Sequence, residues 1–450
     1  MDIAADIQGL LAGPKFPDRE FVAAGATFGE VYAMAAGLHQ ILTGPLYRGK
    51  PVCLAVDDRA VLAAALLASL AGGPPLLLPY AFSAVALARM QQLTGFATAI
   101  ADPGRELPAA TAVIRPQQGS ATRWSSDARQ GTQAEFLRIF TGGTTGAPQI
   151  WSKTGENIFG EGFFLARYFK ITAQDRIVAT VPPYHIYGLL FSVILPLVSG
   201  ATVAAATPSF PAEITDAVQG QGATVLVSIP AHYRTLRERT MAATPLRLAF
   251  SSAGMLDAGD NEAFCRQNRV GIAEVYGSTE TGGIATRNRF LGETCFTPFP
   301  IVSWKIREQR ICVRSPFLSP DLPRAEDGFF TTGDRVEACG TEGFALRGRV
   351  DGVAKVGGKR VDLEEVRALI KKESGVADCV VIALPEAGGR EYRVVALIQG
   401  AAVDIDLIRK KLAAALEPSF QPRLIKAVQR IPLRENGKYD RDAIIRLLAT

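Results

Sequence analysis

Residues 175–206 read "DRIVATVPPYHIYGLLFSVILPLVSGATVAAA" and contain two strand-like runs with a helical run between them. The run at 175–183 ends in two prolines and predicts a buried strand, and the run at 189–200 predicts a buried helix. Two further apolar runs, "ATVLVSIP" (223–230) and "LRLAFSS" (246–252), predict more buried strands separated by helical stretches. Strands that alternate with helices in this way are typical of an α/β layer with a largely parallel sheet.

The whole chain is predicted to contain two or three domains, because 450 residues are too many for one hydrophobic core. Residues 1–350 contain the α/β layers, with short β-type runs at 301–347 that predict a small barrel-like part. Residues 351–450 form a compact α+β pattern. The Pro-, Gln-, Ser- and Arg-rich stretch 101–135 is expected to form loops. We therefore expect an α/β protein with a large N-terminal domain and a small C-terminal domain.

Composition and charge argue against several classes of protein. Hydrophobic residues make up 48% of the chain and charged residues 21%, which is ordinary for a globular protein. The net charge is +5, and residues 351–450 carry most of it, with 18 Lys and Arg against 14 Asp and Glu. This mild and mixed excess argues against a dedicated nucleic-acid binder and suits an acidic partner.

The sequence also predicts a cytoplasmic location without a membrane span. The N-terminal stretch "MDIAADIQGL" lacks the basic residues of a signal peptide. The most apolar window, at 61–80, is interrupted by Gly-Gly-Pro-Pro at 72–75, well short of the roughly 20 apolar residues of a spanning helix. Six cysteines without a C-x-x-C pair and three dispersed histidines give no zinc pattern.

A glycine- and threonine-rich stretch, "FTGGTTGAPQIWSKTG" (140–155), suits a polyphosphate ligand. Glycines allow close approach of the backbone, successive amides form an anion-binding nest, and threonine hydroxyls add donors. The stretch is not a Walker A motif, because Gly146 is followed by Ala147 and Pro148 rather than by Lys and a hydroxyl residue. A P-loop nucleoside triphosphatase is therefore not expected.

Four more motifs follow in a fixed order: "VYGSTETGG" (275–283), "FFTTGDR" (329–335), "LRGRVDGVAKVGGKRVDLEEVR" (346–367) and "RENGKYDR" (434–441). Each alone is explained by an ordinary turn. Together they resemble the adenylate-forming superfamily of acyl- and aryl-CoA synthetases, nonribosomal peptide adenylation domains and luciferases. The resemblance runs from about residue 135 to the C-terminus, and the first 130 residues are short for the family and carry no diagnostic motif.

The resemblance implies an ATP site. In the family the glycine-rich motif cradles the β- and γ-phosphates, and the loop matching "SSAGML" (251–256) lies along the adenine. An aromatic residue of the next motif stacks on the base, and an Asp and an Arg further on reach the ribose. These roles fall here on Thr141, Gly142, Gly143, Thr144, Thr145, Gly146, Ala253, Gly254, Tyr276, Gly277, Asp334 and Arg349.

The resemblance also implies the catalytic groups. Thr279 matches the residue that bonds the α-phosphate, and Glu280 matches the ligand of Mg²⁺, a cation that prefers oxygen ligands. Lys438 matches the lysine that bridges the substrate carboxylate and the α-phosphate. Asp351 falls where the family has its hinge, so that 1–350 becomes the adenylation domain and 351–450 a mobile domain that carries the lysine. No side-chain nucleophile is required.

The segment "VPPYHIYGLL" (181–190) resembles the family segment that lines the acid pocket. His185 is either a core histidine or a pocket residue close to the chemistry, and its motif favours the pocket. Tyr187 lies where aryl-acid ligases place a residue against the aromatic ring, which favours an aryl acid such as a benzoate or hydroxybenzoate. A medium-chain fatty acid is the alternative. The aromatic residues at 163–169 have helical spacing and are expected to belong mainly to the core.

The thiol acceptor is implied only as a class. Coenzyme A and the phosphopantetheine arm of an acidic acyl carrier protein present the same sulfhydryl, and the basic C-terminal region suits either. Gly357 and Gly358 in "KVGGKR" (355–360) lie where the family lines its thiol tunnel, although they fit a plain hairpin turn equally well.

One departure from the family pattern concerns the end of the glycine-rich motif, where Pro148 is followed by Gln149 instead of the usual lysine. Slower adenylation and a repositioned lysine such as Lys153 are two interpretations. A third is a nucleotide- or acyl-adenylate-binding protein of the same fold with little turnover. Because Glu280 and Lys438 remain, the sequence favours an active ligase.

Overall fold

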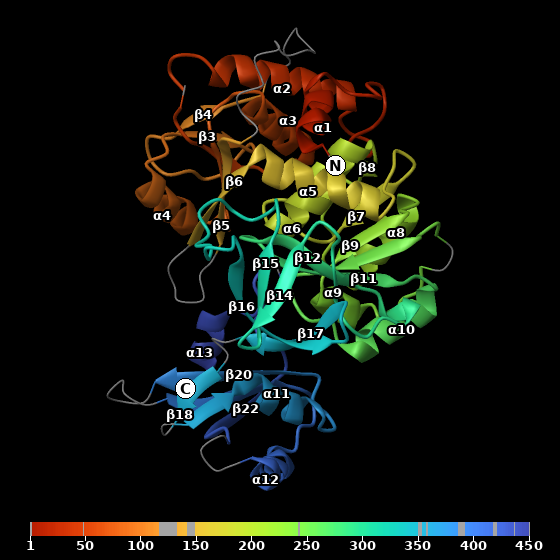
Figure 1. Ribbon diagram of the computed structural model, residues 1–450, viewed down its shortest axis with the longest axis vertical. Coiled ribbons are helices and arrows are strands. Elements are labelled where there is room, and N and C mark those ends of the chain that lie inside the picture. Colours follow the sequence, from red (N-terminus) through yellow and green to blue (C-terminus); the bar gives the residue numbers. More distant parts are fainter. Residues whose placement is uncertain are drawn as a thin grey trace. The chain divides into compact units, whose positions relative to one another are not determined.

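The structure is a computed structural model. It describes residues 2–47, 49–116, 133–141, 149–241, 244–349, 353–356, 359–385, 392–416, 421–435 and 437–449. The chain forms two compact units (Figure 1). One contains Met1–Ser303 and Arg314–Ala325, and the other contains Trp304–Val313 and Glu326–Thr450. The architecture is mixed α/β with a larger and a smaller unit, as the sequence predicts.

The first unit begins with a six-stranded sheet, drawn in orange in Figure 1. Its strands in chain order are β1 (Val52–Ala55), β2 (Leu76–Leu78), β3 (Thr98–Ala101), β4 (Ala112–Ile114), β5 (Glu135–Thr141) and β6 (Gln149–Thr154). The spatial order is β4-β3-β1-β2-β5-β6, and only β6 is antiparallel to its neighbour. Strand β4 corrects the expectation of loops throughout 101–135. It is an edge strand of three residues, too short to show an alternating pattern.

A seven-stranded sheet forms the second layer of this unit. Its strands are β7 (Arg176–Ala179), β8 (Thr202–Val203), β9 (Val225–Ser228), β10 (Leu248–Ser251), β11 (Ile272–Ser278), β12 (Gly282–Arg287) and β13 (Thr297–Pro298). The spatial order is β13-β12-β11-β10-β9-β7-β8. Strands β8, β7, β9, β10 and β11 run parallel, which confirms the parallel sheet predicted from 175–252, whereas β12 and β13 are antiparallel additions.

Helices cover and separate the two sheets. They are α1 (Ile3–Leu11), α2 (Phe28–Leu42), α3 (Arg59–Leu70), α4 (Ala84–Thr94), α5 (Gly155–Tyr168), α6 (Ile186–Leu189), α7 (Leu195–Ser199), α8 (Pro211–Gly220), α9 (Pro230–Thr235) and α10 (Ala258–Asn268). Helix α5, yellow in Figure 1, contacts β6 of one sheet and β12 of the other, and therefore lies between them. Its N-terminus is fixed by Thr154, whose hydroxyl accepts from the Asn157 amide.

The apolar windows of the sequence are core elements. Helix α3 is buried on nearly its whole circumference, and the predicted helix at 189–200 is a continuous segment in which a π-helical turn, η2 (Leu190–Ile194), joins α6 to α7. A short 3₁₀ turn, η3 (Arg289–Leu291), follows β12. Among the described residues, no helix combines the length and apolar character needed to cross a membrane.

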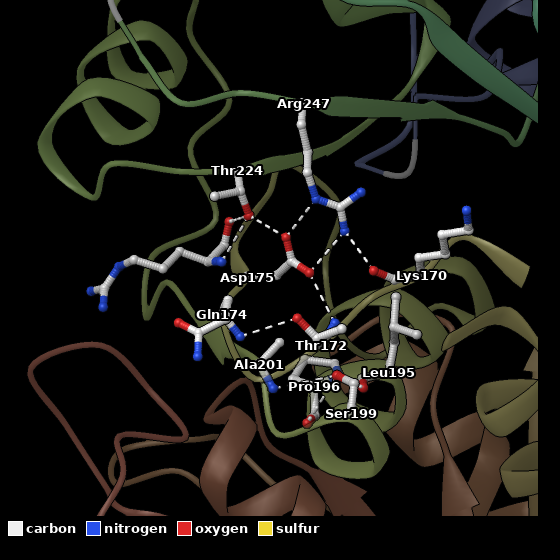
Figure 2. A network of polar contacts seen from close by, with 11 residues as sticks. Lys170, Thr172, Gln174, Asp175, Leu195, Pro196, Ser199, Ala201, Thr224 and Arg247 are labelled. Atoms are coloured by element: carbon white, nitrogen blue, oxygen red, sulfur yellow. Dashed lines mark hydrogen bonds and ion pairs between the residues drawn. The ribbon is translucent and has the colours of Figure 1, made fainter. Parts of the chain in front are cut away.

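A polar network ties together the amino ends of the parallel strands (Figure 2). Asp175, Thr224 and Arg247 directly precede β7, β9 and β10. The Asp175 carboxylate accepts from Arg247 Nε at 2.8 Å, from Arg247 Nη2 at 2.8 Å and from Thr224 Oγ1 at 2.7 Å. Burial alone would raise the pKa of Asp175, but these donors and the Thr172 amide outweigh burial and lower the pKa. The network fixes the edge of the sheet opposite the carboxyl ends of its strands.

The second unit contains three small sheets. A four-stranded sheet, in the order β14-β15-β16-β17, corresponds to the predicted barrel-like part. A two-stranded ribbon of β18 and β19 and a three-stranded sheet, β20-β21-β22, follow. The strands are β14 (Ser303–Arg307), β15 (Arg310–Arg314), β16 (Phe330–Cys339), β17 (Gly343–Arg349), β18 (Val353–Val356), β19 (Lys359–Asp362), β20 (Asp378–Pro385), β21 (Tyr392–Gln399) and β22 (Leu424–Val428).

The helices of this unit, α11 (Leu363–Lys371), α12 (Ile405–Ala415) and α13 (Arg441–Ala449), pack on the three-stranded sheet through two apolar clusters. The α+β pattern expected from residue 351 onward is present. The compact units, however, divide near residues 303 and 326, because the strands β15, β16 and β17 belong to the second unit. The predicted hinge, Asp351, lies outside the described residues and stays a prediction.

Candidate active site

The carboxyl edge of the seven-stranded sheet collects most of the residues predicted for the first unit. Strands β7, β9, β10 and β11 are parallel, so the segments that follow them emerge at one edge. In open α/β sheets this edge is where ligands bind. The segments at this edge are 180–188, 229–233, 252–254 and 279–281.

The hairpin between β11 and β12 presents Thr279 and Glu280 at its turn. The turn is fixed by reciprocal bonds between Ser278 and Thr281. The Thr281 hydroxyl accepts from the Ser278 amide at 3.1 Å, and the two hydroxyl oxygens lie 2.9 Å apart. Gly277 allows the two strands to meet, because a Cβ there would lie 2.3 Å from the Gly282 carbonyl oxygen. The turn is therefore a rigid platform.

Glu280 is half-buried, and its main chain is held by two donors. Its carbonyl oxygen accepts from the Ser319 amide at 2.8 Å and from Lys153 Nζ at 3.4 Å. Within the described ranges, no group of three or more His, Cys, Asp or Glu side chains could hold a metal alone. One carboxylate at a rigid turn fits Mg²⁺, which takes one or two protein carboxylates and completes its shell with water and phosphate oxygens.

The loop after β10 lies beside this hairpin. Ser252 donates from its hydroxyl to the Val275 carbonyl oxygen at 2.8 Å, which ties the loop to β11. Ala253 has a left-handed backbone with φ of 70°, and Ala253 and Gly254 are both exposed. Tyr276 is half-buried on β11, with its ring centroid 5.9 Å from that of Phe296. The structure thus brings the residues predicted around adenine to the same edge as Thr279 and Glu280.

The segment after β7 carries the predicted pocket residues. His185 directly precedes α6 and is half-buried, with its ring 4.7 Å from that of Tyr184. Tyr187 is buried, and its hydroxyl donates to the Ser228 carbonyl oxygen at 3.1 Å, at the end of β9. Burial raises the pKa of Tyr187 well above its ordinary value. The Tyr187 hydroxyl is therefore bonded to the sheet, and the ring is the part of this side chain that would line a pocket.

Sequence reasoning missed a polar cluster next to Tyr187. The Thr180 hydroxyl oxygen lies 2.8 Å from that of Ser228 and 2.7 Å from His232 Nδ1. Burial lowers the pKa of His232 to about 4, so the imidazole is neutral at pH 7. In the sequence, the three histidines are far apart and do not indicate a common site. The available signal is that Thr180, Ser228 and His232 lie at or just after the ends of predicted parallel strands.

The glycine-rich motif joins β5 to β6. Thr141 at the end of β5 lies opposite Gln149 at the start of β6. The other predicted phosphate-binding residues, Gly142, Gly143, Thr144, Thr145 and Gly146, lie outside the described residues. Gln149 is exposed, whereas Lys153 is 1% exposed and its Nζ donates to the Phe317 carbonyl oxygen at 3.1 Å. Lys153 therefore points into the core and does not present its ammonium beside Gln149.

The second unit positions the remaining predicted residues. Asp334 and Arg349 are opposite each other on β16 and β17, and Arg349 Nη1 lies 3.3 Å from Asp334 Oδ1. The two predicted ribose-binding residues are therefore neighbours. Gly333 makes room for them, because a Cβ there would lie 2.7 Å from Arg349 Nη2. Gly357 and Gly358 lie outside the described residues.

Lys438 lies exposed on a hairpin between β22 and α13. The Arg434 amide donates to the Lys438 carbonyl oxygen at 2.8 Å, and Gly437 provides the left-handed turn with φ of 74°. The next residue, Tyr439, donates to Asp378 Oδ2 at 2.8 Å and accepts from Arg367 Nη2 at 3.3 Å. The hairpin is therefore fixed to the body of its unit immediately beside the lysine.

The fold is that of an α/β protein whose predicted ligand-binding residues in the first unit lie mostly at the carboxyl ends of parallel strands. More specifically, the chain belongs to the family of AMP-binding enzymes, which matches residues 12–319. A sulfoacetate–CoA ligase of Cupriavidus necator is 25% identical over 336 residues, covering 68% of this chain and 66% of the relative. The p-hydroxybenzoic acid–AMP ligase FadD22 of Mycobacterium tuberculosis is 26% identical over 456 residues, covering 93% of this chain and 64% of the relative.

Among solved structures, ATP-bound MatB from Rhodopseudomonas palustris aligns with a TM-score of 0.83. The alignment covers 99% of this chain and 98% of MatB at 21% identity, which shows a shared fold. The chain spans slightly less than two thirds of the length of the two curated relatives.

Proposed function

We propose that the protein is an AMP-forming acid–thiol ligase that activates a carboxylic acid as an acyl-adenylate and transfers the acyl group to a thiol. One observation carries this proposal. At one sheet edge, an exposed loop (Ala253 and Gly254), a half-buried tyrosine (Tyr276) and a rigid turn with a hydroxyl and a carboxylate (Thr279 and Glu280) lie together. This arrangement suits a nucleotide with its base on the loop and its phosphates at the turn.

In the first half-reaction, a carboxylate oxygen of the acid forms a bond to the α-phosphorus of ATP. The bond from that phosphorus to the oxygen that bridges to the β-phosphate breaks, and pyrophosphate leaves with the electron pair. Negative charge accumulates around the α-phosphate, so oriented donors and cations stabilise the transition state. The Thr279 hydroxyl and the Lys438 ammonium supply this stabilisation, and Asp334 and Arg349 hold the ribose.

Glu280 would hold Mg²⁺, whose chemistry is to neutralise charge on the phosphate oxygens. The chain's own contribution is to fix the Glu280 main chain between two donors, so that its carboxylate needs little reorganisation when the metal binds.

In the second half-reaction, the thiol loses its proton and its sulfur forms a bond to the acyl carbon, while the bond from that carbon to the AMP oxygen breaks. We infer coenzyme A or a carrier-bound phosphopantetheine as the thiol, with Gly357 and Gly358 lining its path. A hinge at Asp351 would withdraw Lys438 between the two steps, so that 1–350 and 351–450 act as functional domains. The cytoplasm, where CoA is available, fits this chemistry.

For the acid, we favour an aryl acid such as a benzoate or hydroxybenzoate. The support is the buried Tyr187 ring beside Phe191, with ring centroids 5.0 Å apart, and the neutral His232 at the same sheet edge. A relative that covers 93% of this chain is named for p-hydroxybenzoic acid, whereas another is named for sulfoacetate. A medium-chain fatty acid remains the alternative.

The test is pyrophosphate release with ATP and Mg²⁺ across benzoates, hydroxycinnamates, fatty acids, small dicarboxylates and sulfonated acids, first without thiol. A strong response to hydroxybenzoates supports the aryl proposal, and a response confined to fatty or small acids replaces it. Thioester formation with CoA or a phosphopantetheinyl carrier protein then identifies the acceptor. As a control, Glu280→Gln should weaken the Mg²⁺-dependent reaction.

Gln149 favours one second candidate, a nucleotide- or acyl-adenylate-binding protein with little turnover. It is exposed where the family places a cation, and the nearby Lys153 is buried. Tight ATP binding in a folded protein, with no pyrophosphate release from any acid of the panel, would favour this candidate.

A further inference from the structure

Two buried charged side chains have no part in the proposed mechanism. Lys153 on β6 is 1% exposed and Glu161 on α5 is 3% exposed. Both residues belong to the layer around the six-stranded sheet, yet their polar atoms reach the β11–β12 hairpin of the other sheet. They therefore connect the two sheets directly beneath the turn that carries Thr279 and Glu280.

Lys153 holds the turn through main-chain carbonyls. Its Nζ donates to the Phe317 carbonyl oxygen at 3.1 Å and to the Glu280 carbonyl oxygen at 3.4 Å. The Ser319 amide donates to the same Glu280 oxygen at 2.8 Å. The peptide of Glu280 is thereby fixed from below by an ammonium and by the segment that contains Phe317 and Ser319.

Glu161 holds the other side of the same turn. Its Oε1 accepts from the Gly283 amide at 2.7 Å. A Cβ at Gly282 would lie 2.7 Å from Glu161 Oε2, and a Cβ at Gly283 would lie 3.1 Å from Oε1. The pair of glycines in "TETGG" therefore accommodates this carboxylate, and any side chain at Gly282 would displace it.

Burial of the Lys153 and Glu161 charges is energetically unfavourable. Burial lowers the pKa of the Lys153 ammonium and raises the pKa of the Glu161 carboxyl, and each charge partly offsets the effect on the other. The carboxylates of Glu280 and Asp321 also interact with Lys153. Because well-packed apolar residues often replace a buried charge pair without loss of stability, packing alone does not require these two residues.

We propose that Lys153 and Glu161 are positioning residues that set the orientation of the Glu280 carboxylate toward the metal and the phosphates. Lys153 acts through the Glu280 peptide and Glu161 through the Gly283 amide. The chain thus supplies a lysine beneath the turn, although it lacks the family's lysine at position 149. The metal-binding role of Glu280 rests on the proposed function, but the positioning role also applies to a protein that only binds nucleotide.

The test measures ATP affinity by calorimetry with and without Mg²⁺, in the absence of any acid, so that it does not depend on turnover. Lys153→Met removes the ammonium at similar volume. We expect the gain in ATP affinity from Mg²⁺ to fall about tenfold, with the Mg²⁺-free affinity unchanged. Lys410→Met, at an exposed position of α12, is the matched control and should match the unmodified protein.

A second variant separates positioning from folding. Lys153→Met/Glu161→Gln removes both buried charges and should recover most of any loss in melting temperature. If the two residues position Glu280, the Mg²⁺ defect persists in this double variant. The proposal is wrong, and the residues are structural only, if the double variant recovers both its melting temperature and the gain in ATP affinity from Mg²⁺. It is also wrong if Lys153→Met alone retains the full gain in ATP affinity from Mg²⁺. Pyrophosphate release by the unmodified protein tests the proposed function separately.

Discussion

Gln149 stands where the resemblance to the family predicts a lysine. It is exposed, and it lies opposite Thr141 at the point where the glycine-rich motif returns to β6. A cation at this place would stabilise the pyrophosphate as it leaves. Two unit charges 4 Å apart in water interact by about 1 kcal/mol, which corresponds to about a fivefold rate change.

We therefore predict that Gln149→Lys raises the kcat of acid-dependent pyrophosphate release about fivefold at saturating ATP. Gln149→Leu, which changes the residue without adding a charge, is the control and should give no increase. A Lys variant that is no faster than the Leu variant would mean that position 149 does not face the leaving group.

At the residue scale, the sequence predicts the residues of the motifs but not which charged side chains are buried. Glu280, Tyr276 and Thr279 were predicted because their motif is diagnostic, and the structure brings them together. One interpretation of the sequence makes Lys153 the repositioned lysine of the glycine-rich motif, and its burial cannot be read from "QIWSKT", in which polar residues flank it. Among its partners, Glu161 lies on the next helix, α5, but the Phe317 and Glu280 carbonyls are distant in sequence, and only tertiary packing brings them to Lys153.

Among the structural elements, the hairpin that carries Lys438 depends on the tyrosine that follows. Tyr439 bonds to Asp378 and Arg367, which belong to β20 and α11. Tyr439→Phe keeps the ring and removes the hydroxyl. A hydrogen bond of this kind contributes about 0.5–1.5 kcal/mol. We expect kcat for adenylation to fall about two- to tenfold, with the KM for ATP nearly unchanged, because Lys438 is retained but less well oriented.

Tyr392→Phe on β21 is the control for this prediction, because Tyr392 is exposed and distant in sequence from the hairpin. Steady-state kinetics of pyrophosphate release measures both variants. Equal kinetics for Tyr439→Phe and the unmodified protein would show that the hairpin holds its shape without these bonds.

The network at the amino ends of β7, β9 and β10 should affect stability without affecting the site (Figure 2). Arg247→Ala removes two charged hydrogen bonds to Asp175 and leaves that carboxylate buried. We expect a loss of about 2 kcal/mol in the free energy of unfolding of the first unit. ATP affinity should stay unchanged, because the site lies at the opposite edge of the sheet.

The pH dependence of this effect has a definite sign. The pKa of Asp175 is lowered in the folded protein, so its contribution is present above the unfolded pKa of about 3.9 and is lost as the pH falls through the folded value. The melting temperatures of Arg247→Ala and the unmodified protein should therefore differ at pH 7 and converge in acid. A constant difference across this range would assign the effect to lost packing of the arginine.

The central strands β7, β9 and β10 could be predicted because each lies in a continuous apolar run, as expected for strands that are buried on both faces. They lie where the sequence places them. Strand β4 could not be predicted, because three residues carry no periodic signal. The π-helical turn between α6 and α7 was also invisible, because a wider turn in a buried helix changes hydrogen bonding without changing hydrophobicity.

At the scale of the whole molecule, the boundary between the compact units and the predicted hinge lie at different residues. The compact units divide near residues 303 and 326, where β15, β16 and β17 join the second unit. The predicted hinge at 351 comes from the family resemblance and concerns which residues move during the reaction. The division into compact units reflects which residues pack together, and it does not show where the chain bends during a reaction. Asp334 and Arg349 remain on the N-terminal side of the hinge in this division.

The division of catalytic residues between the domains predicts that the half-reactions are separable. In the proposed mechanism, Lys438 stabilises charge at the α-phosphate, and that charge develops only while the acyl-adenylate forms. Loss of a group that acts only in the transition state lowers kcat by about 10²–10³-fold. We therefore expect Lys438→Ala to abolish most acid-dependent pyrophosphate release, while thioester formation from a chemically prepared acyl-adenylate stays within about threefold of the unmodified protein. Arg430→Ala, an exposed neighbour in the same unit, is the control. If Lys438→Ala slows both half-reactions equally, the lysine supports the fold or the thiol step as well, and its assignment to the adenylation step alone is wrong.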